Sequence, residues 1–137
     1  MKNRGWLLKM LCMGILLLGG LLISCGKAEE ELKKLEFTVV EEGRLPEELL
    51  KLIDGKKAES FKLTYADGGY LYLCVGYGKQ STGGYSITVN QLGASDNAIY
   101  LDTNLIGPTQ AEAQSASPSY PYMVVKIPFV DKTVVFE

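Results

Sequence analysis

Three cysteines carry the most reactive side chains of this 137-residue sequence, and their surroundings decide what chemistry they can do. Cys12 lies inside an apolar N-terminal run, Cys25 follows that run directly, and Cys74 stands within the apolar residues 71–75. The sequence contains no histidine, which removes Ser–His and Cys–His catalysis and the commonest ligand of transition metals. A free cysteine among apolar neighbours is usually a small buried side chain, so we expect Cys74 to be buried and unpaired.

Carboxylates are the remaining groups with acid–base chemistry, and they form no recognisable catalytic pair. Glycoside hydrolysis needs two carboxyl groups at a defined separation, and no serine-centred nucleophile elbow is present either. Four acidic residues fall in predicted turns, strands and loops without a spacing that would pair them: Asp67, Asp96, Asp102 and Glu112. We therefore predict a protein that is not an enzyme, with no catalytic residue, no metal site and no cofactor.

The N-terminal 25 residues divide into a short basic start, an apolar run and a small-residue end. Two basic residues among the first four precede an apolar or glycine run at 10–23, which is too short to span a bilayer but suits a signal peptide. The run ends in Leu22-Ile23-Ser24-Cys25, which resembles the lipobox of bacterial lipoproteins. We therefore expect residues 1–24 to be a removed signal peptide and Cys25 to carry a diacylglyceryl anchor on the extracytoplasmic face of the cell membrane. An uncleaved N-terminal membrane helix is the alternative.

Charge and composition after Cys25 restrict the possible partners. Residues 25–36 are dense in Glu and Lys and too poor in apolar side chains to fold alone, so we expect a lipidated polar tether. Removing residues 1–24 removes three basic side chains and leaves 11 basic and 16 acidic ones, a net charge of about −5. No basic patch remains to neutralise phosphates, so nucleic acid is not an expected partner.

Residues 37–137 are expected to form a single, mainly β domain with one short helix. Residues 45–54 predict the helix, because Pro46 suits a first turn and Gly55 can end it. One apolar stripe on this helix is formed by Leu45, Leu49, Leu52 and Ile53. Residues 70–77 are apolar on both faces, which predicts a central strand. Further strands are predicted at 37–40, 61–65, 85–90, 98–106, 122–127 and 133–136, with a loop at 93–97. The pattern predicts an antiparallel sandwich or an open rolled sheet of about six to seven strands.

Two segments between the strands concentrate glycine, tyrosine and proline. Residues 76–85 contain four glycines, which implies backbone at positive φ or close approach of another chain. Residues 118–122 place a tyrosine before Pro121, which favours a cis peptide that would fix the end of this loop. The long polar stretch 107–120 is expected to be either a mobile or a functional loop.

The residue types around these segments are typical of binding loops. From residue 64 to residue 125 the only basic side chain is Lys79, and the stretch is rich in Tyr, Ser, Thr, Gly and Asn. Binding loops place rigid aromatic anchors among adaptable polar contacts. The predicted partner-binding surface consists of Tyr77, Lys79, Thr82, Gly83, Gly84, Tyr85, Tyr120 and Tyr122.

Two motifs in this order resemble the PrcB C-terminal domain family. The first is Thr82-Gly83-Gly84-Tyr85-Ser86-Ile87, and the second is the run Tyr-Pro-Tyr-Met-Val-Val-Lys-Ile-Pro at 120–128, with Gly107-Pro108 between them. The resemblance covers about residues 71–128. It implies a lipoprotein that supports a surface protease as an accessory or stabilising subunit, and it implies no catalytic residues.

One further likeness and one further class of partner stay open. Residues 82–85 also resemble the Thr-Thr-Gly-Tyr loop of chagasin-type cysteine-protease inhibitors, which are β sandwiches, although the Asn-Pro that precedes the inhibitors' motif is absent. Tyrosines beside Asn and Asp could instead stack on cell-wall glycan, which the lack of tryptophan after Trp6 disfavours. The prediction is a membrane-anchored, non-catalytic protein-interaction module, with protease inhibition and glycan binding as its alternatives.

Overall fold

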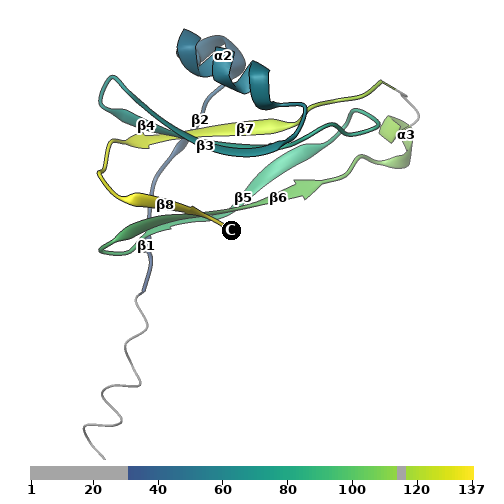
Figure 1. Ribbon diagram of the computed structural model, residues 1–137. Coiled ribbons are helices and arrows are strands. Elements are labelled where there is room, and N and C mark those ends of the chain that lie inside the picture. Colours follow the sequence, from purple (N-terminus) through teal and green to yellow (C-terminus); the bar gives the residue numbers. More distant parts are fainter. Residues whose placement is uncertain (1–30, 114–116) are drawn as a thin grey trace, which may run out of the picture. The chain divides into compact units, whose positions relative to one another are not determined.

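A computed structural model describes residues 31–113 and 117–137, so the predicted signal peptide and Cys25 lie outside the described residues. Residues Leu32–Glu137 form one folded unit, in which two four-stranded sheets pack as an open β sandwich (Figure 1). Sheet A has the strand order β1-β5-β6-β8, and sheet B has the order β2-β7-β4-β3. The prediction of a mainly β sandwich is confirmed.

The seven predicted strands are all present in the described residues, and β1 is an additional one. The elements in chain order are β1 (Lys33–Lys34), β2 (Thr38–Val39), the 3-10 helix η1 (Glu42–Arg44), α2 (Glu47–Lys56), β3 (Ser60–Asp67), β4 (Tyr70–Tyr77), β5 (Ser86–Ala94), β6 (Ala98–Ile106), α3 (Gln110–Ala113), β7 (Tyr122–Pro128) and β8 (Thr133–Phe136). Within the described ranges, no helix has the length and apolar character needed to cross a membrane.

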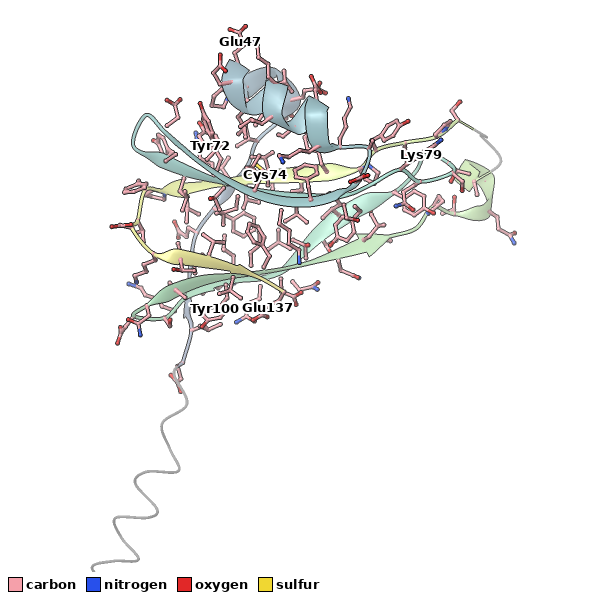
Figure 2. The ribbon with its side chains drawn as sticks, viewed as in Figure 1. Glu47, Tyr72, Cys74, Lys79, Tyr100 and Glu137 are labelled. Carbon is pink, nitrogen blue, oxygen red and sulfur yellow. The ribbon has the colours of Figure 1, made fainter. Side chains whose placement is uncertain are left out.

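β4 is the central strand that the sequence predicts, and both of its faces are buried. Leu71, Leu73 and Val75 face sheet A and form the sandwich core with residues from both sheets. Tyr72 and Cys74 face the opposite way and pack beneath α2 (Figure 2). Since β3 and β7 flank the strand on its two edges, the predictions of a central strand and of a buried Cys74 are both confirmed.

α2 covers the outer face of sheet B through a narrower apolar stripe than the sequence predicts. Leu49 and Ile53, which are one turn apart, are fully buried against the sheet. Leu52 is 41 % exposed, so its assignment to the buried stripe is wrong. The short helix buries only Leu49 and Ile53 against the sheet, and these residues are four apart and therefore lie on one line of the helix. Leu52 lies at the margin of this contact.

Two glycines lie inside regular elements, although Gly55 was predicted to end the helix and Gly93 to begin a loop. α2 runs through Gly55 to Lys56, because an interior glycine costs a helix only about 1 kcal/mol. β5 runs through Gly93 to Ala94, and a Cβ at Gly93 would approach the Cβ of Leu32 to 3.0 Å. The glycine therefore admits the N-terminal chain beside β5, and the predicted loop at 93–97 shrinks to 95–97.

β8 makes sheet A mixed, which corrects the expectation of a wholly antiparallel arrangement. Residues Thr133–Phe136 pair in parallel with the first half of β6. The connection 129–132 leads from sheet B to sheet A, so β8 enters beside β6 in the same direction. Apolar alternation is the same in parallel and antiparallel edge strands, so the sequence pattern does not distinguish them.

β1 lies within residues 25–36, which were expected to be an unfolded tether. It pairs antiparallel with the last two residues of β5, and Leu35 packs against the sandwich core. The side chains of Lys33 and Lys34 are exposed, so no apolar alternation signals this strand. The folded unit consequently begins at Leu32, ahead of the expected start at residue 37.

The connections between strands gather at two ends of the sandwich (Figure 1). The entry end holds the turns 68–69 and 95–97 and the connection 129–132. The backbone N–H of Phe129 donates to Gly69 O (2.9 Å) and Lys132 Nζ donates to Ser95 O (2.8 Å), so the three connections are tied together. β1 starts at this end, because Lys33 pairs with Ala94. The loop end, opposite, holds residues 78–85, 107–113 and 117–121.

Candidate functional site

The two segments that the sequence singles out meet at the loop end. Gln80 and Ser119 exchange two backbone hydrogen bonds of 2.8 and 3.0 Å as an isolated antiparallel bridge. The Ser119 hydroxyl also donates to Thr82 O at 2.7 Å. Residues 78–85 and 117–122 are therefore one connected surface, although they are far apart in the sequence.

Positive φ angles shape the glycine-rich loop. Gly78 has a φ of 76° and Gly84 has a φ of 83°, which side chains other than glycine rarely adopt. The expectation of positive-φ backbone is thus confirmed at these two positions. Thr82, between them, donates its hydroxyl hydrogen to Gly83 O at 3.2 Å.

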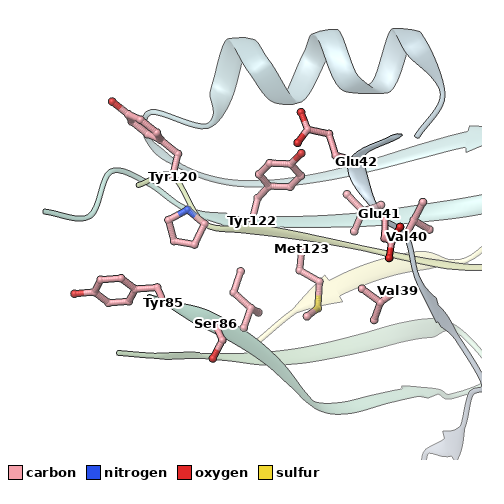
Figure 3. A pocket seen from close by; sticks show the side chains of 12 residues that line it. Val39, Val40, Glu41, Glu42, Tyr85, Ser86, Tyr120, Tyr122 and Met123 are labelled. Carbon is pink, nitrogen blue, oxygen red and sulfur yellow. The ribbon is translucent and has the colours of Figure 1, made fainter. Parts of the chain in front are cut away.

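A cleft of about 450 Å³ opens between the sheets beside this loop (Figure 3). Tyr85 reaches it from the start of β5, whereas Tyr120 and Tyr122 reach it from the segment that leads into β7. Tyr120 is exposed, and Tyr85 and Tyr122 are half-buried. Three of the predicted binding tyrosines are therefore gathered around one cleft.

Tyr77 and Lys79 lie outside this cleft. The Tyr77 hydroxyl is 2.6 Å from the Thr103 Oγ1 on β6, and its ring packs against the sandwich core. Tyr77 therefore links sheet B to sheet A from within the fold. The side chain of Lys79 is exposed at the loop end (Figure 2), and its backbone N–H donates to Ala58 O at 3.3 Å.

The peptide that precedes Pro121 is trans, so the expected cis bond is wrong. The trans chain already satisfies its hydrogen bonds, because Pro121 O accepts from the Tyr77 N–H at 3.1 Å. The Gln80–Ser119 bridge holds the same segment two residues earlier. Backbone pairing to two parts of the chain fixes this loop end.

Carboxylates from a third segment border the cleft, and no sequence motif predicts their position there. Glu41 and Glu42, which follow β2, line it together with Val39 and Val40. Burial raises the pKa of Tyr122, and the negative charge of Glu42 raises this pKa further. The Tyr122 hydroxyl therefore stays protonated at neutral pH and is available as a hydrogen-bond donor.

The strand edge beside the cleft is open. In the described part of the chain, β1 pairs with β5 only at Gly93 and Ala94, so residues 86–89 of β5 have no strand on the edge away from β6. Unpaired backbone groups of an edge strand can accept an added strand. This edge and the tyrosines together form a surface suited to an extended polypeptide.

Catalytic and metal-binding chemistry finds no visible support in the described residues. Burial raises the pKa of the Cys74 thiol to about 12, so it is almost entirely protonated and is a poor nucleophile. No group of three or more Cys, Asp and Glu side chains in these ranges is arranged to hold a metal ion.

The fold and the cleft define a helix-covered, open β sandwich with a cleft lined by tyrosines at one end. Residues 71–128 match the family model described as PrcB C-terminal. The match starts in β4 and ends with β7, so it includes both segments of the candidate site. The family is an accessory domain and not a known catalytic one. No curated protein and no solved structure gave a significant match.

Proposed function

We propose that this protein is an extracytoplasmic lipoprotein, held at the cell membrane by a diacylglyceryl Cys25, whose β sandwich serves as a non-catalytic accessory or stabilising subunit of a surface protease. The observation that carries the proposal is the match of residues 71–128 to the PrcB C-terminal family, which suggests a subunit associated with a protease complex. The Leu22-Ile23-Ser24-Cys25 motif supports the anchor.

The positions of the two ends support this function. β1 brings the chain into the fold at the entry end, whereas Tyr85 and Tyr120, which line the cleft, lie at the loop end. A lipid on Cys25 would therefore hold the sandwich by the end opposite the cleft. The cleft would stay accessible to a partner at the cell surface.

The composition of the cleft supports a protein partner. Tyrosines bury large areas at a small cost in conformational entropy, and they are enriched among the residues that dominate binding energy. The open edge of β5 beside them can add hydrogen bonds to the backbone of a partner. These two features fit an extended segment of another protein.

Affinity capture with a matched pair of surface variants tests partner binding. The tagged full chain is expressed in its own host, crosslinked and purified from solubilised membranes. Tyr120 is 39 % exposed at the loop end, and Leu52 is 41 % exposed on α2, outside the cleft. Tyr120→Ala should reduce capture of the main partner by about tenfold, whereas Leu52→Ala should not change it. Capture of the same partner by both variants at wild-type levels would reject the loop end as the binding surface.

Protease activity decides the direction of the effect. An accessory or stabilising subunit predicts that deleting this protein lowers the abundance and activity of the captured protease. The inhibitor alternative predicts that the deletion raises protease activity while protease abundance stays constant. Failure to capture any protease would reject the assignment to a protease complex.

The anchor is tested separately with Cys25→Ser. The variant should lose labelling by a radioactive or clickable fatty acid and should no longer be retained by the membrane. Unchanged lipid labelling would show that Cys25 is not the lipidated residue.

Glycan binding is retained as a second function because the cleft places tyrosines beside the carboxylates of Glu41 and Glu42. Aromatic faces and carboxylates are groups by which a protein can bind a sugar. Sedimentation with purified peptidoglycan tests it directly. Tyr85→Ala should reduce sedimentation if the cleft holds a glycan, and no sedimentation of the wild-type chain would exclude this function.

A further inference from the structure

The entry end of the sandwich carries three exposed apolar side chains. Phe129 is 51 % exposed, Tyr70 is 42 % exposed and Val130 is 38 % exposed. Tyr70 pairs with Pro128 across the β4–β7 ladder, so it lies beside the chain that continues into Phe129 and Val130. These three residues are called the tip below. Contiguous exposed apolar side chains at one end of a domain commonly mark a contact surface.

The tip is held in place by the fold. The Phe129 N–H donates to Gly69 O at 2.9 Å, and Gly68 and Gly69 form a tight turn at positive φ. On the other side of the tip, Lys132 Nζ donates to Ser95 O at 2.8 Å. The exposure of the tip is therefore built into hydrogen-bonded turns and is not the fraying of a chain end.

The chain enters the fold at this same end, shortly after the predicted lipid. Only seven residues, 26–32, separate Cys25 from Lys33, which is the first residue of β1 and pairs with Ala94 at the entry end. The eight residue steps from Cys25 to Lys33 span at most about 29 Å when fully extended. A lipid on Cys25 would therefore keep the entry end within about 30 Å of the bilayer surface.

Charged side chains around the tip carry both signs. Asp67, Asp96 and Asp131 are exposed in the turns of the entry end. The nearby basic side chains are Lys33, Lys132 and Lys126, and the Lys126 Nζ lies 4.4 Å from the centroid of the Tyr70 ring. Mixed charge offers no net attraction to an anionic lipid headgroup, so any contact with lipid would depend on the apolar side chains. It also limits insertion to the headgroup region, since buried carboxylates are costly in hydrocarbon.

We propose that the tip lies in the interfacial region of the bilayer and acts as a second, non-covalent membrane contact that orients the cleft away from the membrane. This inference rests on the proposed lipid anchor at Cys25. One lipid anchor on a tether leaves the domain free to rotate, whereas a tip contact at the same end restricts that rotation.

Tryptophan fluorescence in brominated vesicles tests the proposal with a clean background. Trp6 is the only tryptophan in the sequence, so all variants carry Trp6→Phe. Phe129→Trp and Tyr70→Trp report on the tip, and Tyr120→Trp, at the loop end, is the matched control. The lipidated full chain is reconstituted in phosphatidylcholine vesicles with and without dibrominated lipid, and vesicle flotation is measured in parallel. Urea unfolding confirms that each variant is folded.

The expected result is at least about twofold quenching at positions 129 and 70 and little quenching at position 120, without any requirement for anionic lipid. If the vesicles float with the protein but neither tip reporter is quenched, the anchor stands and the tip proposal is overturned. Equal quenching at all three positions would also overturn it, because the domain would then lie flat. If the protein does not float, the proposed anchor fails and the tip proposal fails with it.

Discussion

Replacing Gly84 by valine tests whether the shape of the glycine-rich loop matters for binding. Gly84 has a φ of 83°, a conformation that costs a residue with a Cβ about 1–2 kcal/mol and a β-branched residue more. The valine therefore shifts the loop backbone or stays strained. Gly83→Val is the matched control, because Gly83 lacks a positive φ and no atom lies within 4 Å of a Cβ placed there.

The size of the effect follows from what the loop contacts. A shift of the backbone at Gly84 would break the 2.7 Å hydrogen bond from the Ser119 hydroxyl to Thr82 O. Such a hydrogen bond contributes about 0.5–1.5 kcal/mol to the unfolding free energy. Strain and this lost bond together predict that Gly84→Val lowers the unfolding free energy by about 2 kcal/mol. The sandwich core is distant from the loop, so the variant should remain folded while partner capture falls strongly.

Urea unfolding and affinity capture from the native membrane are measured on both glycine variants. The expected pattern is a stability loss and a capture loss for Gly84→Val, with Gly83→Val close to wild type in unfolding free energy. The reasoning is refuted if the two variants match in unfolding free energy and in capture. A stability loss without a capture loss would refute only the binding role of the loop.

Three further predictions concern the interior. Leu49→Ala leaves a cavity between α2 and sheet B, because Leu49 is fully buried there, and it should lower the unfolding free energy by about 2–5 kcal/mol. Leu52→Ala, at an exposed position, should lower it by less than about 1 kcal/mol. Equal losses of unfolding free energy, measured by urea unfolding, would contradict the packing of the helix. Tyr77→Phe removes the 2.6 Å hydrogen bond to Thr103 and should cost about 0.5–1.5 kcal/mol, a loss that should be absent in a Thr103→Val background. Burial raises the pKa of Cys74 from 9.0 to about 12, so alkylation at pH 8, followed by peptide mapping, should be at least about 10³-fold slower in the folded than in the unfolded protein. Because the pKa is higher in the folded state, the stability contributed by this thiol is complete below pH 9 and is lost as the pH rises towards 12. Cys74→Ala should weaken that alkaline loss, and an unchanged pH dependence would contradict the burial argument.

Elements whose side chains carry a clear burial pattern could be predicted from the sequence. β4 carries apolar side chains on both of its faces. The structure accordingly buries Leu73 against sheet A and Cys74 against α2. β1 shows the opposite case, since its two lysines are exposed and only backbone pairing to β5 makes it a strand. The parallel pairing of β8 with β6 could not be predicted either, because the alternation of apolar side chains does not depend on the direction of the strand.

The candidate site was predictable in its parts but not as an assembly. Glycine content pointed to positive φ at Gly84, and the tyrosines near Pro121 marked the second segment. Their union depends on one hydroxyl bond from Ser119 and one backbone bridge, neither of which has a sequence signature. Glu42 joins the cleft only because β2 lies beside β7, a pairing that single-strand patterns do not reveal.

The functional unit must be longer than the segment that matches the family. Residues 71–128 supply β4 to β7 and both site segments, but they leave the outer face of sheet B incomplete. Cys74 and Val124 are buried there by Leu49 and Ile53 of α2, which precede the match. Without α2 these apolar side chains would face water, and each fully buried aliphatic side chain so exposed costs about 1.5–3 kcal/mol. The cleft is also bordered by Glu41 and Glu42 from outside the match, so any ligand of the cleft would meet a surface that only the whole unit Leu32–Glu137 provides.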